Sequence, residues 1–181
     1  MKIAVFFTVF FGLFASVGVA QETYYLNPGD RVFVEVWNEP DMQRDVIILP
    51  DGGLSFPLAG QVEAAGLTPQ ELQDALTERL SQYISTPVVT VSVVEMRGNT
   101  VFVIGQVNAP GSFIMNTPMT ALQALSLSGG FTPFANTRSI RIIRKGENGN
   151  QVLRVNYSAL RDGDNLESNH VLLSGDVLIV P

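Results

Sequence analysis

Residues 26–34 of this chain read LNPGDRVFV, and residues 172–180 read LLSGDVLIV. The shared pattern is Leu-x-x-Gly-Asp-x-(Val/Leu)-x-Val, with the pairs Gly29-Asp30 and Gly175-Asp176. Because glycine accepts a positive φ and aspartate accepts hydrogen bonds from nearby amides, each pair predicts a tight turn. The apolar residues that alternate after each turn predict a strand. One turn and its strand therefore begin the folded part of the chain, and the other turn and its strand end it. Such turns are explained by backbone structure and need no catalytic or binding role.

The composition suggests one domain or two small ones. The chain has 181 residues, of which 46% are hydrophobic, and its 16 glycines and 10 prolines favour short strands and turns over long helices. The formal charge is −6 and no basic cluster is present, which argues against nucleic acid as a partner. Cysteine is absent, so we expect neither disulfides nor a lipid-modified cysteine, and hence not a lipoprotein.

Residues 1–20 predict a secretory signal peptide. Lys2 is their only charge, an apolar run follows, and small residues precede a cleavage point between Ala20 and Gln21. A membrane anchor that stays on is the alternative, but the run is shorter than the ~20 residues that a spanning helix needs. We therefore expect an exported protein.

Residues 23–97 predict a small α+β domain. The turn Pro28-Gly29-Asp30 leads into a strand with Val32, Val34 and Val36 on one face. The turn Pro50-Asp51-Gly52 is expected to join residues 46–49 and 54–56 as a hairpin.

A helix and a strand complete this part. Thr68 followed by Pro69 and Glu71 has the pattern of a capping box, and an apolar stripe follows at helical spacing. Alternating valines over residues 89–93 then predict a strand, so the α+β unit closes near Glu95.

Residues 98–181 predict a second domain after a polar hinge at residues 97–99. Two strands flank the turn Pro110-Gly111, and a helix from about Thr120 to Leu127, capped by Thr120 or Thr117, stops at Gly129-Gly130. Further strands are expected at residues 139–144, 151–155, 171–173 and 177–180.

No catalytic arrangement stands out. A carboxylate pair for glycoside chemistry would have to come from Asp30, Glu35, Glu39, Asp41, Asp45 and Asp51. Asp30 and Asp51, however, belong to glycine turns, where aspartate is expected for backbone reasons. His170 is the only histidine, which excludes a histidine-rich metal site and makes a solvated histidine the better interpretation. We expect no enzyme, no cofactor and no metal.

For two groups of side chains, an ordinary structural role has to be weighed against a binding role. The densest basic group comprises Arg138, Arg141, Arg144 and Lys145. It suits an acidic partner or a sugar acid, but alternate positions on a strand usually form its solvated face. The aromatic residues that suit stacking on sugars are Trp37, Tyr24, Tyr25 and Phe134. Core or interface packing is the default for them.

The order of the motifs is more specific than any one of them. In the first part they are Pro28-Gly29-Asp30, Val36-Trp37, Pro50-Asp51-Gly52, Pro57-Leu58-x-Gly60, Ala65-Gly66-Leu67-Thr68 with its helix, and Pro87. From Val101 they are Val103-x-Gly105-x-Val107-x-x-Pro110-Gly111, Leu122 to Leu125, Ser128-Gly129-Gly130-Phe131-Thr132, Ala135 and Gly175-Asp176. The first part resembles the N-terminal domain of bacterial outer-membrane polysaccharide export proteins, the Wza-like group. The second resembles the SLBB module, a β-grasp-like domain for soluble ligand binding.

The resemblance implies an α+β export domain followed by a β-grasp-like SLBB domain. It also implies a non-enzymatic role in the export of capsular polysaccharide or exopolysaccharide. Family members assemble into a homo-oligomeric ring that encloses a periplasmic channel, and they work with an inner-membrane polysaccharide co-polymerase. Larger members carry a lipidated cysteine and a C-terminal amphipathic pore helix. Neither is present here, so we expect a short form in the periplasm that reaches the outer membrane through a separate barrel protein.

Two other functions stay open at this point. One is a periplasmic glycan-binding module that acts as a monomer, with exposed aromatic residues as its sugar contacts. The other is a glycan-cleaving enzyme, which would depend on Asp30 or Asp51.

Overall fold

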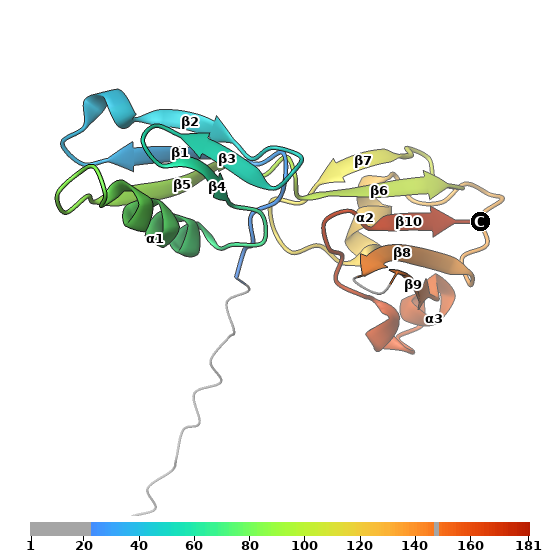
Figure 1. The fold of residues 1–181 in the computed structure, drawn as a ribbon. Helices are drawn as coiled ribbons and strands as arrows, with labels where there is room; N and C mark the ends of the chain where they lie inside the picture. Colours follow the sequence, from blue (N-terminus) through green and yellow to red (C-terminus); the bar gives the residue numbers. More distant parts are fainter. Residues whose placement is uncertain (1–22, 147–148) are drawn as a thin grey trace, which may run out of the picture.

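The computed structural model describes residues 23–146 and 149–181 and contains two hydrophobic cores. One core is built from residues 26–89 and the other from residues 101–180. We call the parts built on them the first and the second domain. They lie end to end, and the chain crosses between them once, from β5 to β6 (Figure 1). The expected signal peptide and its cleavage point, Ala20 and Gln21, lie outside the described residues. Within the described residues, no helix is long and apolar enough to cross a membrane.

The first domain combines two small sheets and one long helix. Its elements are β1 (Arg31–Val36), the 3₁₀ turn η1 (Pro40–Met42), β2 (Arg44–Ile47), β3 (Gly53–Phe56), β4 (Gly60–Glu63), α1 (Pro69–Leu80) and β5 (Val89–Glu95). Strands β2, β1 and β5 form an antiparallel sheet in that order, and β3 pairs with β4. The side chains of Val32, Val34 and Val36 are fully buried, as the alternation predicts. Helix α1 packs on β5 with Leu72, Leu76 and Leu80 buried.

The expected hairpin between residues 46–49 and 54–56 is wrong. The turn between them forms, because the Gly52 amide donates to the Leu49 carbonyl at 2.9 Å. However, β2 pairs with β1, and β3 turns away to pair with β4. The strands β1 and β2 form an antiparallel ladder of four residue pairs, whereas β2 and β3 contact each other at little more than the turn that joins them. The strand β2 therefore pairs with β1 and not with β3, the strand that follows it in the sequence.

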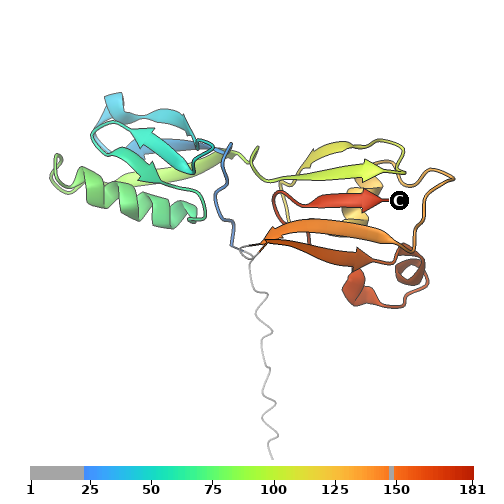
Figure 2. The ribbon, with the colours of Figure 1, turned by 45° about the vertical axis from the view of Figure 1, so that its right-hand side comes forward.

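The second domain is a five-stranded sheet with a helix on one face. Its elements are β6 (Thr100–Gly105), β7 (Gly111–Ile114), α2 (Ala121–Leu127), β8 (Ile140–Gly146), β9 (Gly149–Val155), α3 (Tyr157–Arg161), the 3₁₀ turn η2 (Leu166–Ser168) and β10 (Val177–Val180). The strand order is β7-β6-β10-β8-β9, with β10 parallel to β6 and antiparallel to β8. Figure 2 shows the sheet in front of α2. The last strand thus lies in the centre, and the α+β, β-grasp-like expectation is confirmed.

The two similar segments, residues 26–34 and 172–180, occupy equivalent positions in their sheets. Strand β1 is the central strand of its sheet, and β10 is the central strand of the other. Central strands are buried on the core side, which explains the alternating valines and leucines. Each Gly-Asp turn therefore introduces the strand on which its sheet is assembled.

The helices α1 and α2 begin at the residues that the sequence predicts, and a third helix was not predicted. The Thr68 hydroxyl accepts from the Glu71 amide at 3.2 Å and the Glu71 carboxylate accepts from the Thr68 amide at 2.8 Å, which is the predicted capping box. Thr120 is the N-cap of α2. The sequence interpretation missed α3, a short helix capped by Asn156, because five residues give no helical periodicity.

Candidate functional site

The first Gly-Asp turn buries a carboxylate at the end of the first domain. Asp30 is fully buried. Its Oδ2 accepts from the Asn27 amide at 2.8 Å and from the Tyr24 hydroxyl at 2.5 Å. Gly29 has φ +95°, which a turn of this type requires at its third position. The turn is therefore fixed both by its glycine and by its carboxylate.

The second Gly-Asp turn repeats this arrangement at the facing end of the second domain. Asp176 is 1% exposed, and its Oδ2 accepts from the Leu173 amide at 2.9 Å, again three residues earlier. Here Arg144 supplies the charge, with Nη2 at 2.7 Å from Oδ2 and Nε at 3.0 Å from Oδ1. A buried carboxylate needs such partners, because an unpaired charge in the interior is costly.

The two turns hold the same glycine of the linker. The Gly98 amide donates to Asp30 Oδ1 at 2.8 Å, and the Gly98 carbonyl accepts from the Ser174 hydroxyl at 2.6 Å. The Gly175 amide donates to the Thr100 carbonyl at 2.8 Å. Residues 97–99, which we expected to be a polar hinge, thus form a joint that is hydrogen-bonded to both domains. The Gly98 amide bonds to the first domain, and the Gly98 carbonyl bonds to the second.

No side chain fits at the linker glycine. A Cβ atom on Gly98 would lie 2.8 Å from Asn27 Cβ and 3.0 Å from Asp30 Oδ1, and it would also meet the Pro28 carbonyl oxygen. A Cβ atom does not come within 3.0 Å of another residue's Cβ or of a carbonyl oxygen, so the joint depends on glycine for close approach.

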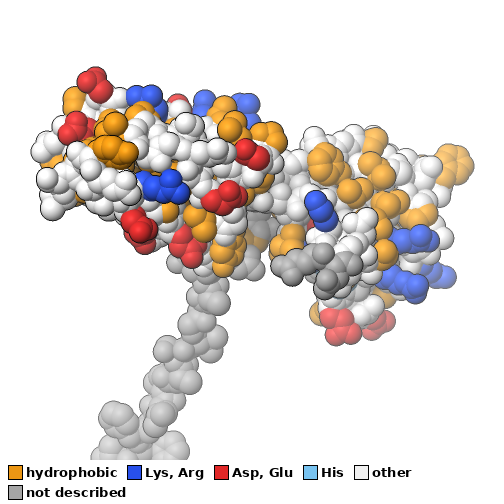
Figure 3. Space-filling model, viewed as in Figure 1, with side chains coloured by type: hydrophobic (Ala, Val, Ile, Leu, Met, Phe, Trp, Pro, Cys, Tyr) orange, Lys and Arg blue, Asp and Glu red, His pale blue; other side chains and the backbone are white. Residues whose placement is uncertain are grey.

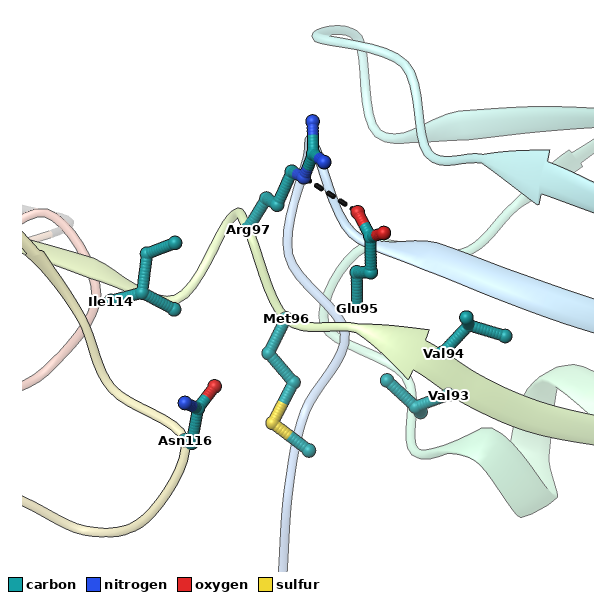
Figure 4. Close-up of a pocket in the computed structure, with 7 residues that line it drawn as sticks. All are labelled: Val93, Val94, Glu95, Met96, Arg97, Ile114 and Asn116. Carbon is teal, nitrogen blue, oxygen red and sulfur yellow. Dashed lines mark ion pairs between the residues drawn. The ribbon is translucent and has the colours of Figure 1, made fainter.

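A second set of contacts stiffens the linker on its first-domain side. Glu95, the last residue of β5, pairs with Arg31 of β1 and with Arg97 at 2.5 Å. Figure 4 shows Arg97 and Glu95 turned toward each other at the edge of a groove of about 340 Å³. Met96 and Asn116 lie on either side of this groove. The linker therefore runs along a surface that both domains contribute to.

A larger groove of about 470 Å³ lies on the linker near the start of the described chain. Its lining combines aromatic, amide and apolar side chains, including Tyr24, Tyr25, Asn27, Asn99, Met115 and Leu172. Its lining side chains are all uncharged. Such a lining suits a neutral ligand rather than an ion.

Two family models match the chain in series. The model for the polysaccharide biosynthesis/export protein family matches residues 19–94, and the model for the SLBB domain matches residues 99–180. The joint at Gly98 lies between them. The chain therefore has a polysaccharide biosynthesis/export domain followed by an SLBB domain.

Three relatives have names that fit this family. The EPS I polysaccharide export outer membrane protein EpsA of Ralstonia solanacearum is 28% identical, over 68% of this chain and 40% of its own length. The polysialic acid transport protein KpsD of Escherichia coli is 28% identical, over 73% of this chain and 24% of its own. The exopolysaccharide production protein ExoF of Rhizobium meliloti is 26% identical, over 77% of this chain and 33% of its own length. The chain thus spans less than half the length of these export proteins.

The other predicted turns each adjoin a strand or a helix. In Pro50-Asp51-Gly52, Gly52 has φ +89° and the Asp51 carboxylate accepts from the Gly53 amide at 3.0 Å. Gly111 begins β7 directly after Pro110. Gly129 and Gly130 follow α2 with φ +74° and +76°.

Two of the six carboxylates considered for glycoside chemistry, Asp30 and Asp51, bond to backbone amides. Asp30 holds the joint, and Asp51 bonds its own turn and Gln61. Asp41 and Asp45 are exposed. The lone histidine, His170, lies with Nε2 3.3 Å from the Arg154 carbonyl. Within residues 23–146 and 149–181, no group of three acidic, histidine or cysteine side chains is placed to hold a metal ion.

The basic group does not behave as one solvated face. Arg138, Arg141 and Lys145 are exposed, but Arg144 turns to Asp176 and is only partly accessible. That part of the interpretation is wrong, because Arg144 shares the inward side of β8 with Ile140 and Ile142. This period-two position was the signal that could have identified it. The aromatic rings of Trp37, Tyr25 and Phe134 are 68%, 56% and 85% exposed, whereas Tyr24 packs on the first core.

Sequence reasoning missed the residues that make the joint. The contacts of Gly98, Ser174 and Arg144 were not predicted, because their partners lie 68, 76 and 32 positions away. No local pattern identifies contacts over such separations.

Replacing Tyr24 by Phe is expected to change the alkaline stability of the protein. Burial, and then the hydrogen bond to Asp30, raise the pKa of Tyr24 well above its ordinary value of 10.0. Because the folded pKa is raised, the phenol stabilises the fold fully below pH 10, and this contribution is lost as the pH rises toward the folded pKa. Urea unfolding of Tyr24→Phe should show a loss of about 1 kcal/mol at neutral pH and a flatter decline above pH 10. Tyr83→Phe, whose ring is exposed, is the control, and an unchanged alkaline decline in Tyr24→Phe would contradict the assignment.

Proposed function

We propose that this chain is a non-enzymatic subunit of an envelope complex that exports capsular polysaccharide or exopolysaccharide. In this proposal, copies of the chain assemble into a periplasmic oligomeric conduit. The observation that carries the proposal is the export domain followed by an SLBB domain, with Gly98 between them hydrogen-bonded to Asp30 and to Ser174. A conduit has to keep its shape while a polymer moves through it. A joint that is hydrogen-bonded to both domains would help to keep that shape.

The printed names of the relatives support polysaccharide as the cargo. EpsA is named as an exporter of EPS I polysaccharide and KpsD as a transporter of polysialic acid. For this chain we infer the same class of cargo, without a specific sugar. The proposed partners are an inner-membrane polysaccharide co-polymerase and a separate outer-membrane barrel protein, and the proposed location is the periplasm at the outer membrane.

Deleting the gene for this chain is expected to stop export while synthesis continues. Polysaccharide measured in the culture medium should fall at least tenfold, and polymer should accumulate inside the cell envelope. Complementation with the native gene should restore secretion. Unchanged secretion in the deletion strain would overturn the export role, and loss of synthesis without accumulation would point to an earlier step. The mass of the mature chain, alone and with the co-polymerase, tests the conduit, since a strict monomer in both settings contradicts it.

The uncharged groove at the joint favours a second candidate function. Tyr25 offers an exposed ring, and Asn27, Asn99 and Asn116 offer amides beside it. Rings and amides are the groups that commonly bind neutral sugars. A monomer that binds glycan fragments with loss of affinity in Tyr25→Ala would support a glycan-binding module in place of the conduit.

A further inference from the structure

The outer face of the second-domain sheet is exposed, and the charged side chains of its strands are basic. Helix α2 covers the other face, where Val103 and Leu178 are fully buried. As far as the structure describes them, none of the five strands contains an aspartate or a glutamate. Three basic side chains on the outer face are exposed, namely Arg141, Lys145 and Arg154. This side of the sheet therefore attracts negative charge.

Arg141 and Arg154 face each other directly across β8 and β9. The Cβ atoms of such a pair lie about 5 Å apart, and two like charges at that position destabilise a sheet. Over residues 23–146 and 149–181, neither guanidinium forms an ion pair with a carboxylate, whereas Arg144 on the inward side of β8 does. A carboxylate between the two exposed guanidinium groups would accept hydrogen bonds from both and remove their repulsion. The pair thus has the chemistry of a carboxylate site.

Apolar side chains continue from the arginine pair across the rest of the face. Cross-strand pairing puts Ile179 beside Arg141 and Ile104 beside Ile179, in one row. The next row, two residues along each strand, consists of Phe102, Val177, Ile143 and Val152. Phe102, Ile104 and Val152 are 43%, 45% and 53% exposed. Figure 3 shows hydrophobic side chains beside Lys and Arg on this side of the second domain. A matching ligand has an acidic group at one end and an apolar surface beside it.

An acidic sugar has both features. Its carboxylate suits the arginine pair, and the carbon-bound hydrogens of its ring suit an apolar surface with an exposed aromatic ring, Phe102. A small inorganic anion would use the arginine pair alone and leave the apolar rows uncovered. The groove at the joint does not offer the same chemistry, because its lining side chains are all uncharged.

The first domain does not compete for such a ligand. Residues 23–97 contain eleven acidic residues and four arginines, so this part of the chain repels a polymer that carries carboxylates. The charge distribution therefore directs an acidic polymer to the second domain.

We propose that the outer face of the second-domain sheet binds an acidic polysaccharide, with a sugar carboxylate between Arg141 and Arg154 and the sugar ring on the apolar rows. The inference rests on the cargo class of the proposed function, polysaccharide, and adds that this cargo carries carboxylates. Lys145 lies four residues along β8 from Arg141, about 13 Å away along the strand, and attracts a neighbouring acid of the same polymer. Because the basic groups are exposed, the contact is weak and salt-dependent, which suits a polymer that has to keep moving.

Binding to a polymer of galacturonic acid tests this face. Fluorescence anisotropy of labelled polygalacturonate fragments at low salt should show binding to the purified chain. The fully methyl-esterified polymer has the same sugar rings without charge and should bind at least about tenfold more weakly. Arg141→Gln with Arg154→Gln should weaken binding to polygalacturonate by a similar factor, because the carboxylate loses both guanidinium partners. Phe102→Ser should weaken it as well, by a smaller factor.

The control is Arg79→Gln with Arg161→Gln, which changes the net charge equally at exposed positions on α1 and α3. It should leave binding unchanged, and circular dichroism should show that all variants fold. A native chain that does not bind polygalacturonate, or an equal loss of binding in the control, would overturn the proposed site. Polyglutamate that binds as tightly as polygalacturonate would overturn the sugar and identify an acidic polypeptide as the partner.

The export role is tested separately by secretion in the deletion strain. A deletion that stops export, together with a native chain that does not bind polygalacturonate, would overturn the acidic-sugar site and leave the export role standing. Unchanged secretion together with binding that depends on Arg141 and Arg154 would overturn the export role and leave the site standing.

Discussion

Replacing Asp176 by Ala is expected to lower the free energy of unfolding by about 3–5 kcal/mol. Asp176 is buried and accepts two hydrogen bonds from the Arg144 guanidinium and one from the Leu173 amide. Removing the carboxylate leaves a charged group and an amide without their partner in a protected position. Urea unfolding followed by circular dichroism measures the loss.

The matched control is Asp162→Ala, which removes a carboxylate that pairs with Arg161 on the surface. Exposed pairs contribute ~0–1 kcal/mol, so this variant should unfold almost as the native chain does. The double variant Arg144→Leu with Asp176→Ala should lose less than the two single losses together, since no unpaired charge remains. Equal losses in Asp176→Ala and Asp162→Ala would show that the buried pair does not stabilise the second domain.

Replacing Gly98 by Ala is expected to break the joint between the domains. The added methyl group has no room beside Asn27, Pro28 and Asp30, so the linker must move away and lose its bond to the Asp30 carboxylate. Overpacking of this kind costs typically about 1–3 kcal/mol. The larger effect should be on geometry, because each domain keeps its own core while their orientation becomes free. Small-angle scattering should show a wider range of shapes, and limited proteolysis should cut near residue 98.

Gly111→Ala is the control for this substitution, because a Cβ there meets nothing within 4 Å. It should leave scattering, proteolysis and secretion unchanged. In the deletion strain, Gly98→Ala should restore less secretion than the native gene if a fixed orientation is needed for export. A Gly98→Ala protein with native scattering and native protease resistance would show that the joint does not orient the domains.

Much of the local structure could be predicted from the sequence, because its causes are local. The alternation of valines in β1, the capping box at Thr68 and the glycines that end α2 each rely on residues within a few positions. The short helix α3 was missed for the same reason, since it is stabilised by its docking and not by its own pattern. The α+β class also followed from the order of the elements, and the β-grasp-like form was implied by the resemblance to the SLBB module.

Strand pairing and the candidate site depended on tertiary structure. The strand β2 pairs with β1 in place of its neighbour β3, and Arg144, on the inward side of β8, has Asp176 as its partner. Neither choice is encoded in a short window, because both are settled by which buried groups need a partner once the chain is compact.

The sequence by itself determined that two similar Gly-Asp turns each begin a strand, since glycine permits the turn and aspartate bonds its own backbone. Only the tertiary structure decided that both strands are central and that both turns bind one glycine between the domains. Turn formation is satisfied within four residues, whereas the bonds from Asp30 and Ser174 to Gly98 span 68 and 76 positions. Contacts at that distance exist only after both cores have formed and brought the two ends of the fold to the linker.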